Sequence, residues 1–108
     1  MESDIIVSED GATASVRLSG DIDLATHAAM ESAIASASDT PGVATVVVNL
    51  GGVTFLDSSG IGGLIRGRRL ADAAGIGYRI EGATGIARQA LDLTGVWDYL
   101  SGDQQAAE

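Results

Sequence analysis

The sequence contains no cysteine and no lysine, and its only histidine is His27. Without cysteine there is no disulfide, no thiol nucleophile and no thiolate metal site. Without lysine there is no Schiff base and no lysine for a phosphate-binding loop, and one histidine is too few for a histidine-rich metal site. These absences point away from catalysis, and we expect neither a metal nor another cofactor.

Basic residues are also scarce. All six are arginines, against fifteen acidic residues, so the formal net charge at pH 7 is -9. A chain this acidic, without a basic stripe, is a poor binder of nucleic acid and of anionic membranes. The N-terminus begins acidic, unlike a signal peptide, and no apolar run approaches the ~20 residues that span a bilayer. We therefore expect a cytoplasmic protein, or a cytoplasmic module of a larger one.

The hydrophobic content is sufficient for one core. Of the 108 residues, 45% are hydrophobic, and a chain of this length buries enough surface for one domain but not for two. Neither an internal repeat nor a linker divides the sequence. We expect a single domain over residues 1–108, with an ordered core over about 4–100 and a polar C-terminal tail over 101–108.

The hydrophobic pattern alternates between strand and helix periods. Ala14, Val16 and Leu18 alternate with polar residues, which is typical of a half-buried strand. In the first half of the chain, the expected elements are strands over 4–8 and 14–19, a helix over 26–38 and a strand over 44–50 that is buried on both faces. After a loop over 51–57, we expect Ser58 or Ser59 to cap a helix that runs to about Ala74. A strand over 77–81, a helix over 85–93 and a short edge strand over 97–100 complete the expected order. This order predicts an α/β fold, in which a mixed four- to five-stranded β-sheet packs against three or more α-helices.

The most informative segment is Asp57-Ser58-Ser59-Gly60, which stands where a buried strand has ended and a helix begins. Free backbone N–H groups and the positive end of the helix dipole meet at such a point. One interpretation is a plain helix cap, for which aspartate and serine are favoured. The other is an anion site or a phosphorylated serine, because a phosphate is electrostatically welcome there. The residues alone leave both open.

The helix that follows carries a stripe of small residues at helical spacing, which suits close approach to a sheet. The stripe consists of Gly60, Gly63, Leu64, Gly67, Leu70, Ala71 and Ala74. Ile61 and Ile65 fall beside the stripe. They either pack against a neighbouring helix or form an exposed apolar patch beside Ser58, as expected of a partner-binding surface.

Three segments, in register with this order of elements, carry a family resemblance. They are Gly20-Asp-Ile-Asp-Leu-Ala-Thr26, the run Val46-Val-Val-Asn-Leu50 with Val53-Thr-Phe-Leu-Asp-Ser-Ser-Gly-Ile-Gly62, and Leu91-Asp-Leu-Thr-Gly-Val96. Together they resemble the signature of bacterial anti-sigma factor antagonists, which are members of the STAS domain family. The resemblance covers about residues 4–100, and it implies an STAS-like fold.

The resemblance also implies a function. Members of this family bind an anti-sigma factor that is also a serine kinase, and thereby release a sigma factor for transcription. The kinase phosphorylates the serine directly after the aspartate, here Ser58, and a phosphatase reverses the step. Ser59 stays open as the other acceptor. The implied partner-binding residues are Asp23, Thr26, Asp57, Ser58, Ser59 and Ile61.

Other functions fit the sequence less well. Neither serine lies in a G-x-S-x-G elbow, and the glycines of the 60–63 run follow no nucleotide-binding spacing, so we do not expect an enzyme. The remaining alternative shares the fold: an STAS interaction module of a stress-sensing, lipid-transport or anion-transporter complex, with no sigma factor in its circuit. The sequence leaves open the identity of the kinase, phosphatase and sigma factor, the oligomeric state and any nucleotide binding.

Overall fold

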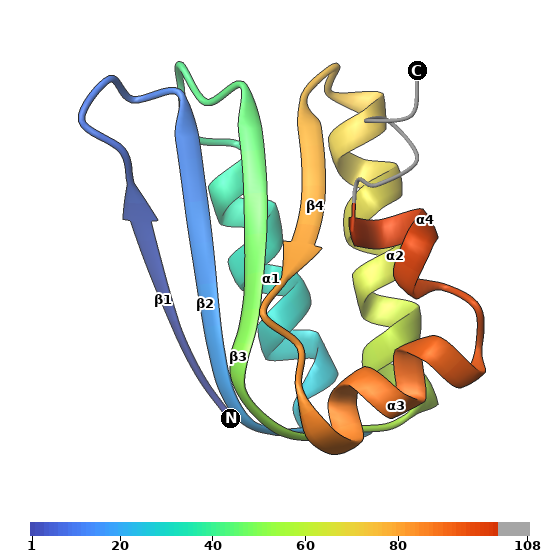
Figure 1. The fold of residues 1–108 in the computed structure, drawn as a ribbon. Coiled ribbons are helices and arrows are strands. Elements are labelled where there is room, and N and C mark those ends of the chain that lie inside the picture. Colours follow the sequence, from blue (N-terminus) through green and yellow to red (C-terminus); the bar gives the residue numbers. More distant parts are fainter. Residues whose placement is uncertain (102–108) are drawn as a thin grey trace.

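A computed structural model of the protein describes residues 1–101, so the predicted tail, apart from Ser101, lies outside the described residues. Its elements, shown in Figure 1, are β1 (Glu2–Val7), β2 (Thr13–Ile22), α1 (His27–Ser38), β3 (Thr45–Leu56), α2 (Ser58–Ala73), β4 (Gly77–Glu81), α3 (Gly85–Leu93) and α4 (Trp97–Ser101). Among the described helices, none has the length and apolar character that a bilayer crossing requires.

The four strands form one mixed sheet in the order β1-β2-β3-β4. Strand β1 pairs antiparallel with β2, whereas the pairs β2–β3 and β3–β4 are parallel. Each parallel step needs a crossover helix, and because both steps run in the same direction, right-handed crossovers place α1 and α2 on the same face of the sheet. The predicted mixed α/β fold is confirmed, with four strands and four helices in the described part of the chain.

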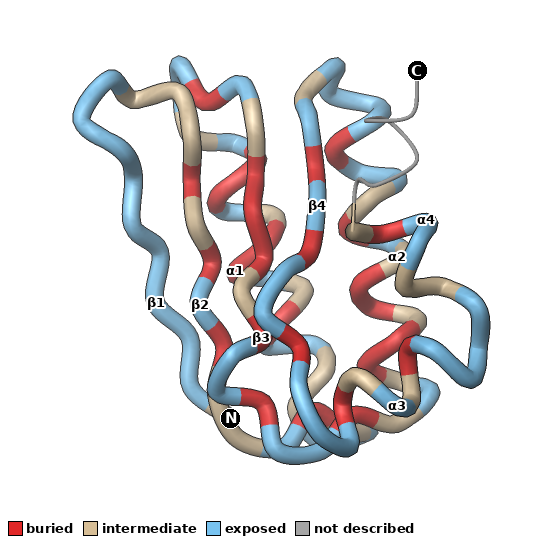
Figure 2. Tube along the Cα trace, viewed as in Figure 1, coloured by how far each residue is buried: buried red, intermediate tan, exposed pale blue. Residues whose placement is uncertain are grey.

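The core lies between the sheet and these two helices, as the buried segments in Figure 2 show. In β2, the alternating residues Ala14, Val16 and Leu18 are all buried, as the pattern predicts. In β3, Val46, Val47 and Val48 are buried in succession, which confirms a strand covered on both faces.

Strand β3 is longer than the sequence predicts. The segment 51–57, expected to be a loop, continues the strand to Leu56, which pairs with Ile22 of β2. The glycines that suggested a loop instead allow a close approach within the sheet: a Cβ atom on Gly52 would lie 2.8 Å from the Cβ atom of Ser19. The register of the two strands shifts at this point, so the glycines mark an irregularity in the ladder and not its end.

The segment 97–100 forms helix α4, so the predicted edge strand is wrong. A helical turn places Trp97 and Leu100 on one face, three residues apart. The Trp97 ring lies 3.9 Å from the guanidinium of Arg88 on α3, and Leu100 is fully buried. A run of four residues has too few repeats for its period to be recognised, so these tertiary contacts decide the conformation.

The predicted stripe of α2 is confirmed at its glycines, at Leu64 and at Ala71, and is wrong at Leu70 and Ala74. Gly60, Gly63 and Gly67 are buried, whereas Leu70 is 41% exposed and Ala74 is exposed. A Cβ atom on Gly60 would meet side chains of the two strand ends, at 2.5 Å from Leu56 Cδ1 and 2.8 Å from Ile22 Cγ2. The stripe therefore brings the start of α2 directly onto β2 and β3.

We expect Gly60→Ala to lower the free energy of unfolding by about 1–3 kcal/mol, because the added methyl group overpacks this contact. The matched control is Gly62→Ala on the same helix, where the added atom would meet only the terminal guanidinium of Arg66, 3.2 Å away, and no backbone atom. Because alanine favours the helix, this variant should be unchanged or stabilised by up to about 1 kcal/mol. Equilibrium denaturation in urea measures both values.

Candidate partner-binding surface at the start of helix α2

Three connections leave the parallel strands at the same end of the sheet, the lower end in Figure 1. The β2–α1 turn carries Asp23 and Thr26, and the β3–α2 junction carries Asp57, Ser58 and Ser59. A backbone hydrogen bond from the Asp57 N–H to the Ile22 carbonyl, 3.2 Å long, joins the two connections. The pairing of β2 with β3 therefore brings together site residues that lie more than thirty positions apart in the sequence.

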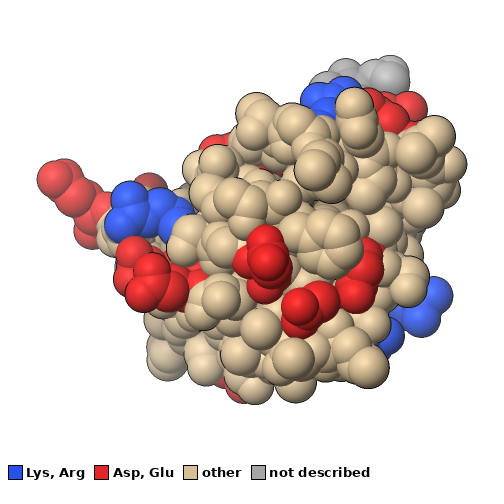
Figure 3. Space-filling view, turned by 90° about the horizontal axis from the view of Figure 1, so that it is seen from below, with Lys and Arg blue, Asp and Glu red and all other residues tan. Residues whose placement is uncertain are grey.

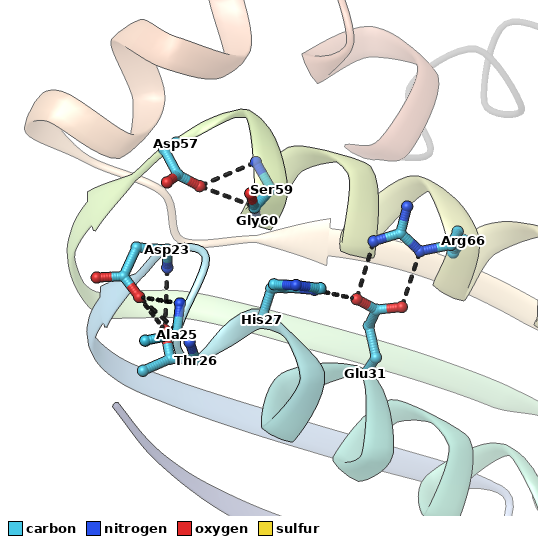
Figure 4. A network of polar contacts seen from close by, with 9 residues as sticks. All are labelled: Asp23, Ala25, Thr26, His27, Glu31, Asp57, Ser59, Gly60 and Arg66. Carbon is cyan, nitrogen blue, oxygen red and sulfur yellow. Dashed lines mark hydrogen bonds and ion pairs between the residues drawn. The ribbon is translucent and has the colours of Figure 1, made fainter.

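Asp57, and not a serine, caps helix α2. Its Oδ1 atom accepts hydrogen bonds from the backbone N–H groups of Ser59, at 2.9 Å, and Gly60, at 3.1 Å (Figure 4). The expectation that Ser58 or Ser59 caps the helix is wrong, because the carboxylate one position earlier already satisfies the free N–H groups and suits the positive end of the dipole.

The capping by Asp57 leaves Ser58 available. Ser58 is the first helical residue and is exposed, and within residues 1–101 its hydroxyl has no hydrogen-bond partner. Ser59 is half-buried, and its backbone N–H is engaged by Asp57. The two neighbouring serines therefore differ in accessibility, a difference that the sequence did not reveal.

Asp23 and Thr26 form a compact turn before α1. The Oδ1 atom of Asp23 accepts from the N–H groups of Ala25 and Thr26, at 3.0 and 3.2 Å. The Oγ1 atom of Thr26 in turn accepts from the Asp23 N–H at 2.9 Å and lies 2.9 Å from the Asp21 carbonyl oxygen, to which it donates. Both side chains are half-buried, so their first role is to hold the shape of this turn.

Ile61 does not belong to an exposed patch. It is 8% exposed and part of the hydrophobic core, while Ile65 is partly buried and packs against that core. The physical reason is that α2 touches α1, β3, β4 and α4, so a wider arc of the helix is covered than the small-residue stripe indicates. The interpretation of Ile61 as an exposed contact beside Ser58 is therefore wrong.

Exposed apolar side chains do occur at this end, on residues that the sequence analysis missed. Leu24 is 76% exposed, Phe55 42% and Ile86 58%. They lie in the β2–α1 turn, at the end of β3 and at the start of α3. Their positions in the sequence could have identified them. Each lies near the carboxyl end of a strand, and the carboxyl ends of parallel neighbouring strands lie at the same end of the sheet.

Acidic side chains surround these residues. Asp21 lies opposite Phe55 in the β2–β3 ladder and accepts a 2.7 Å hydrogen bond from the hydroxyl of Thr54. In the described part of the chain, neither Asp21, Asp23 nor Asp57 forms an ion pair, because five of the six arginines are paired elsewhere. Figure 3 shows acidic side chains near the middle of this end and basic ones only at its margin.

We call this surface the acidic face and define it by its exposed apolar residues, its carboxylates and the free serine. Its members are Asp21, Asp23, Leu24, Phe55, Asp57, Ser58 and Ile86. Such a combination of exposed apolar side chains and unpaired charges of one sign is typical of a protein-binding surface.

A second polar network joins the first half of α1 to the middle of α2 (Figure 4). The guanidinium of Arg66 binds Glu31 with two parallel hydrogen bonds of 2.8 and 2.9 Å, and His27 Nδ1 lies 2.6 Å from the same carboxylate. The hydrogen bonds from Arg66, with a smaller contribution from His27, lower the pKa of Glu31 from 4.5 to about 2. This network links the two helices whose first residues carry the site.

Replacement of the capping residue Asp57 should lower the stability of the folded protein without disturbing its hydrophobic core. We expect Asp57→Ala to lower the free energy of unfolding by about 1 kcal/mol, because two N–H groups at the start of α2 lose their acceptor. Asp57→Asn keeps a side-chain oxygen and should retain most of the stability, apart from the dipole contribution. Thermal unfolding of the three proteins compares them directly, and equal losses in both variants would contradict the capping role.

Because of the hydrogen bonds to Glu31, the free energy of unfolding should depend on pH in the acidic range. Because the pKa of Glu31 is lower in the folded chain, its stabilisation is present above about pH 4.5 and lost as the pH falls toward 2. We expect Glu31→Gln to be less stable than the parent at pH 7 by on the order of 1 kcal/mol, and the difference to vanish near pH 2. Glu81→Gln, which breaks only an exposed ion pair with Arg79, is the control and should change stability little. Urea denaturation at a series of pH values tests this.

Comparisons with known proteins place this fold. The family model described as "Mlab, STAS domain" matches residues 5–101. No curated protein matches the chain by direct comparison. The anti-sigma factor antagonist SpoIIAA in its unphosphorylated form is similar, with a TM-score of 0.75 and 20% identity over 91% of this chain and 84% of that one.

Two further structures are similar over most of their length. An anti-sigma factor antagonist from Mycobacterium paratuberculosis has a TM-score of 0.74 and 25% identity, over 93% of this chain and 83% of its own. The Bacillus cell fate determinant SpoIIAA in its phosphorylated form has a TM-score of 0.67 and 21% identity, over 93% and 88%. The predicted fold is thereby confirmed.

Proposed function

The chain belongs to the STAS domain family, and from this premise we propose that it is an anti-sigma factor antagonist whose binding is switched by phosphorylation of Ser58. In this proposal, the acidic face binds an anti-sigma factor that is also a serine kinase, and a sigma factor is thereby released. Phosphorylation blocks the contact, and a phosphatase restores it. The similarity of the fold to anti-sigma factor antagonists supports the proposal.

The observation that carries the proposal is the state of Ser58. Ser58 is exposed and its hydroxyl has no partner within residues 1–101, at the end of the sheet that also carries exposed apolar side chains. A kinase needs this accessibility, and the half-buried Ser59 offers it less. A phosphate on Ser58 would stand at the N-terminus of α2, where the helix dipole stabilises negative charge, so we expect the modified domain to stay folded.

The effect of a phosphate then falls on binding. The acidic face fits a partner surface that offers apolar contacts with a basic rim, because its own carboxylates have no arginine partners in the described chain. Phosphoserine adds about 1.5 to 2 negative charges beside Asp57. A contact over Ser58 would have to desolvate this dianion, and a tenfold loss of affinity requires only about 1.4 kcal/mol.

We assign no catalytic role to the serine. His27, the one histidine of the chain, points its Nδ1 atom at Glu31, and Glu31 is held by Arg66. A nucleophilic serine needs a base within hydrogen-bond reach, and Ser58 has none in residues 1–101. The geometry favours a hydroxyl that is modified by another enzyme.

The family model also supports a second candidate function, that of an STAS interaction module in another complex, because its description names Mlab together with the STAS domain. In that case the acidic face binds a subunit of a complex with no sigma factor in its circuit. Affinity capture with the purified chain, followed by phosphosite mapping with ATP present, separates the two. A captured serine-kinase anti-sigma factor that labels Ser58 supports the first function, and a membrane or transporter subunit supports the second.

Substitutions at Ser58 test the switch itself. With the captured kinase, we expect Ser58→Ala to bind normally and to incorporate no phosphate, while Ser58→Asp binds more weakly because it adds charge to the acidic face. Ser59→Ala is the matched control and should be labelled and bound as the parent is. Calorimetric titration and phosphate incorporation measure these properties. Undiminished labelling of Ser58→Ala would move the acceptor to Ser59 or remove the switch.

A further inference from the structure

Strand β1 forms an open edge of the sheet. It pairs with β2 on one side, and in the described chain no strand pairs with its other side. All six of its residues are exposed, and Figure 2 shows this exposure along the strand. An open edge presents unpaired backbone N–H and C=O groups, which are a template for another strand.

The second half of β1 is apolar on both faces. Ile5 and Val7 lie opposite Val16 and Ala14 of β2, which are fully buried, so they point to the side of the sheet that the helices cover. Even so, Ile5 is 40% and Val7 42% exposed, because α1 covers this edge strand only in part. Ile6 points to the opposite side and is 46% exposed.

Strand β1 lacks the usual protection of an edge. Proteins protect open edges with proline, positive charge, bulges or very short strands. Strand β1 contains no proline and no basic residue, and its pairing with β2 is regular from Glu2 to Val7. The edge strand β4 offers a contrast, because its exposed side chains are charged and form an ion pair between Arg79 and Glu81.

We propose that β1 is a dimer contact, in which two copies of this chain pair their β1 strands antiparallel about a two-fold axis through Ile6. The two four-stranded sheets then form one continuous sheet, with the helices of both copies on the same side. A two-fold axis perpendicular to the sheet keeps each side chain on its own face. A residue of one strand therefore faces either itself or a residue an even number of positions away in the other copy.

A second copy of this chain fits the distribution of charge in β1 when the axis lies in the apolar half of the strand. The acids Glu2 and Asp4 occupy the first half of the strand and the apolar residues the second half. With the axis at Ile6, Ile5 faces Val7 of the second copy, and Asp4 faces the position of Ser8. The two Asp4 residues then lie four positions apart along the strands, about 13 Å, which is beyond the screening length at physiological salt. An axis at Asp4 would instead oppose the two carboxylates directly.

This contact leaves the acidic face free. Glu2 pairs with Ser19, close to the end of the sheet that carries the acidic face, whereas Ile6 and Val7 lie toward the other end. Because the two β1 strands run in opposite directions, the two acidic faces point away from each other. Dimer formation is thus independent of the proposed binding of an anti-sigma factor, and either proposal can fail alone.

The association itself is tested by sedimentation velocity over a concentration series. We expect the parent chain to shift from monomer to dimer as its concentration rises. Ile6→Lys places two positive charges at the axis and should raise the dissociation constant at least about tenfold. Leu93→Lys is the matched control: it makes the same change at a residue that is 88% exposed and outside β1, and it should dimerise like the parent. A parent chain that stays monomeric throughout would overturn the proposal.

The register is tested by disulfide cross-linking. The sequence contains no cysteine, so only the introduced thiols can react. Opposite residues in an antiparallel pair have Cα atoms about 4.5–5.5 Å apart, within the range of a disulfide. We expect Ile6→Cys to form a disulfide-linked dimer on mild oxidation, and Ile5→Cys to form far less, because residue 5 of one copy faces residue 7 of the other. A mixture of Ile5→Cys and Val7→Cys should cross-link with each other. Preferential cross-linking of Ile5→Cys to itself would overturn the register.

Discussion

The parallel pairing of β2 with β3 is the constraint on which the candidate site depends. These strands stay paired as far as Ile22 and Leu56, past a register shift that Gly52 makes possible by close approach to Ser19. The extended ladder delivers Asp23 and Asp57 to one end of the sheet, where a backbone hydrogen bond joins them.

Glycine in α2 continues this constraint into the helix layer. Gly60 lets the first turn of α2 rest on the ends of both strands, and Gly67 lets the helix approach Ile34 of α1 and the hydroxyl of Tyr78. Asp57 then takes the capping role at the helix start. The exposure of Ser58 follows from these two facts together, because the helix is held by other groups and its first side chain points to solvent. The proposed switch needs this separation of structural and modifiable residues.

Several elements were predictable because their information is local. The alternation in β2 and the glycines of α2 each indicate one buried face, and the β-branched run of β3 indicates a strand buried on both faces. The structure confirms all three. The misses share another cause. From the sequence alone, the Gly51–Gly52 pair predicts a loop, and only the pairing with the neighbouring strand shows that β3 continues. Likewise, the segment with Trp97 and Leu100 predicts a strand, and only its contacts with α3 and the core show that it is a helix. The interpretation of Ile61 as exposed failed for a similar reason, because its burial depends on elements that contact α2 from several sides.

The sequence by itself determined the chemical inventory of the protein and the order of its elements. It contains no thiol and no lysine, its acids outnumber its bases, and Asp57-Ser58-Ser59-Gly60 stands at a strand-to-helix junction. Only the tertiary structure decided which of these residues are available: Ser58 is exposed, Ile61 is buried, and Leu24, Phe55 and Ile86 share one end of the molecule. The physical reason is that composition can be counted directly and the hydrophobic period depends only on residues close together in the sequence. Exposure and the absence of an ion pair depend on contacts between segments that are distant in the chain.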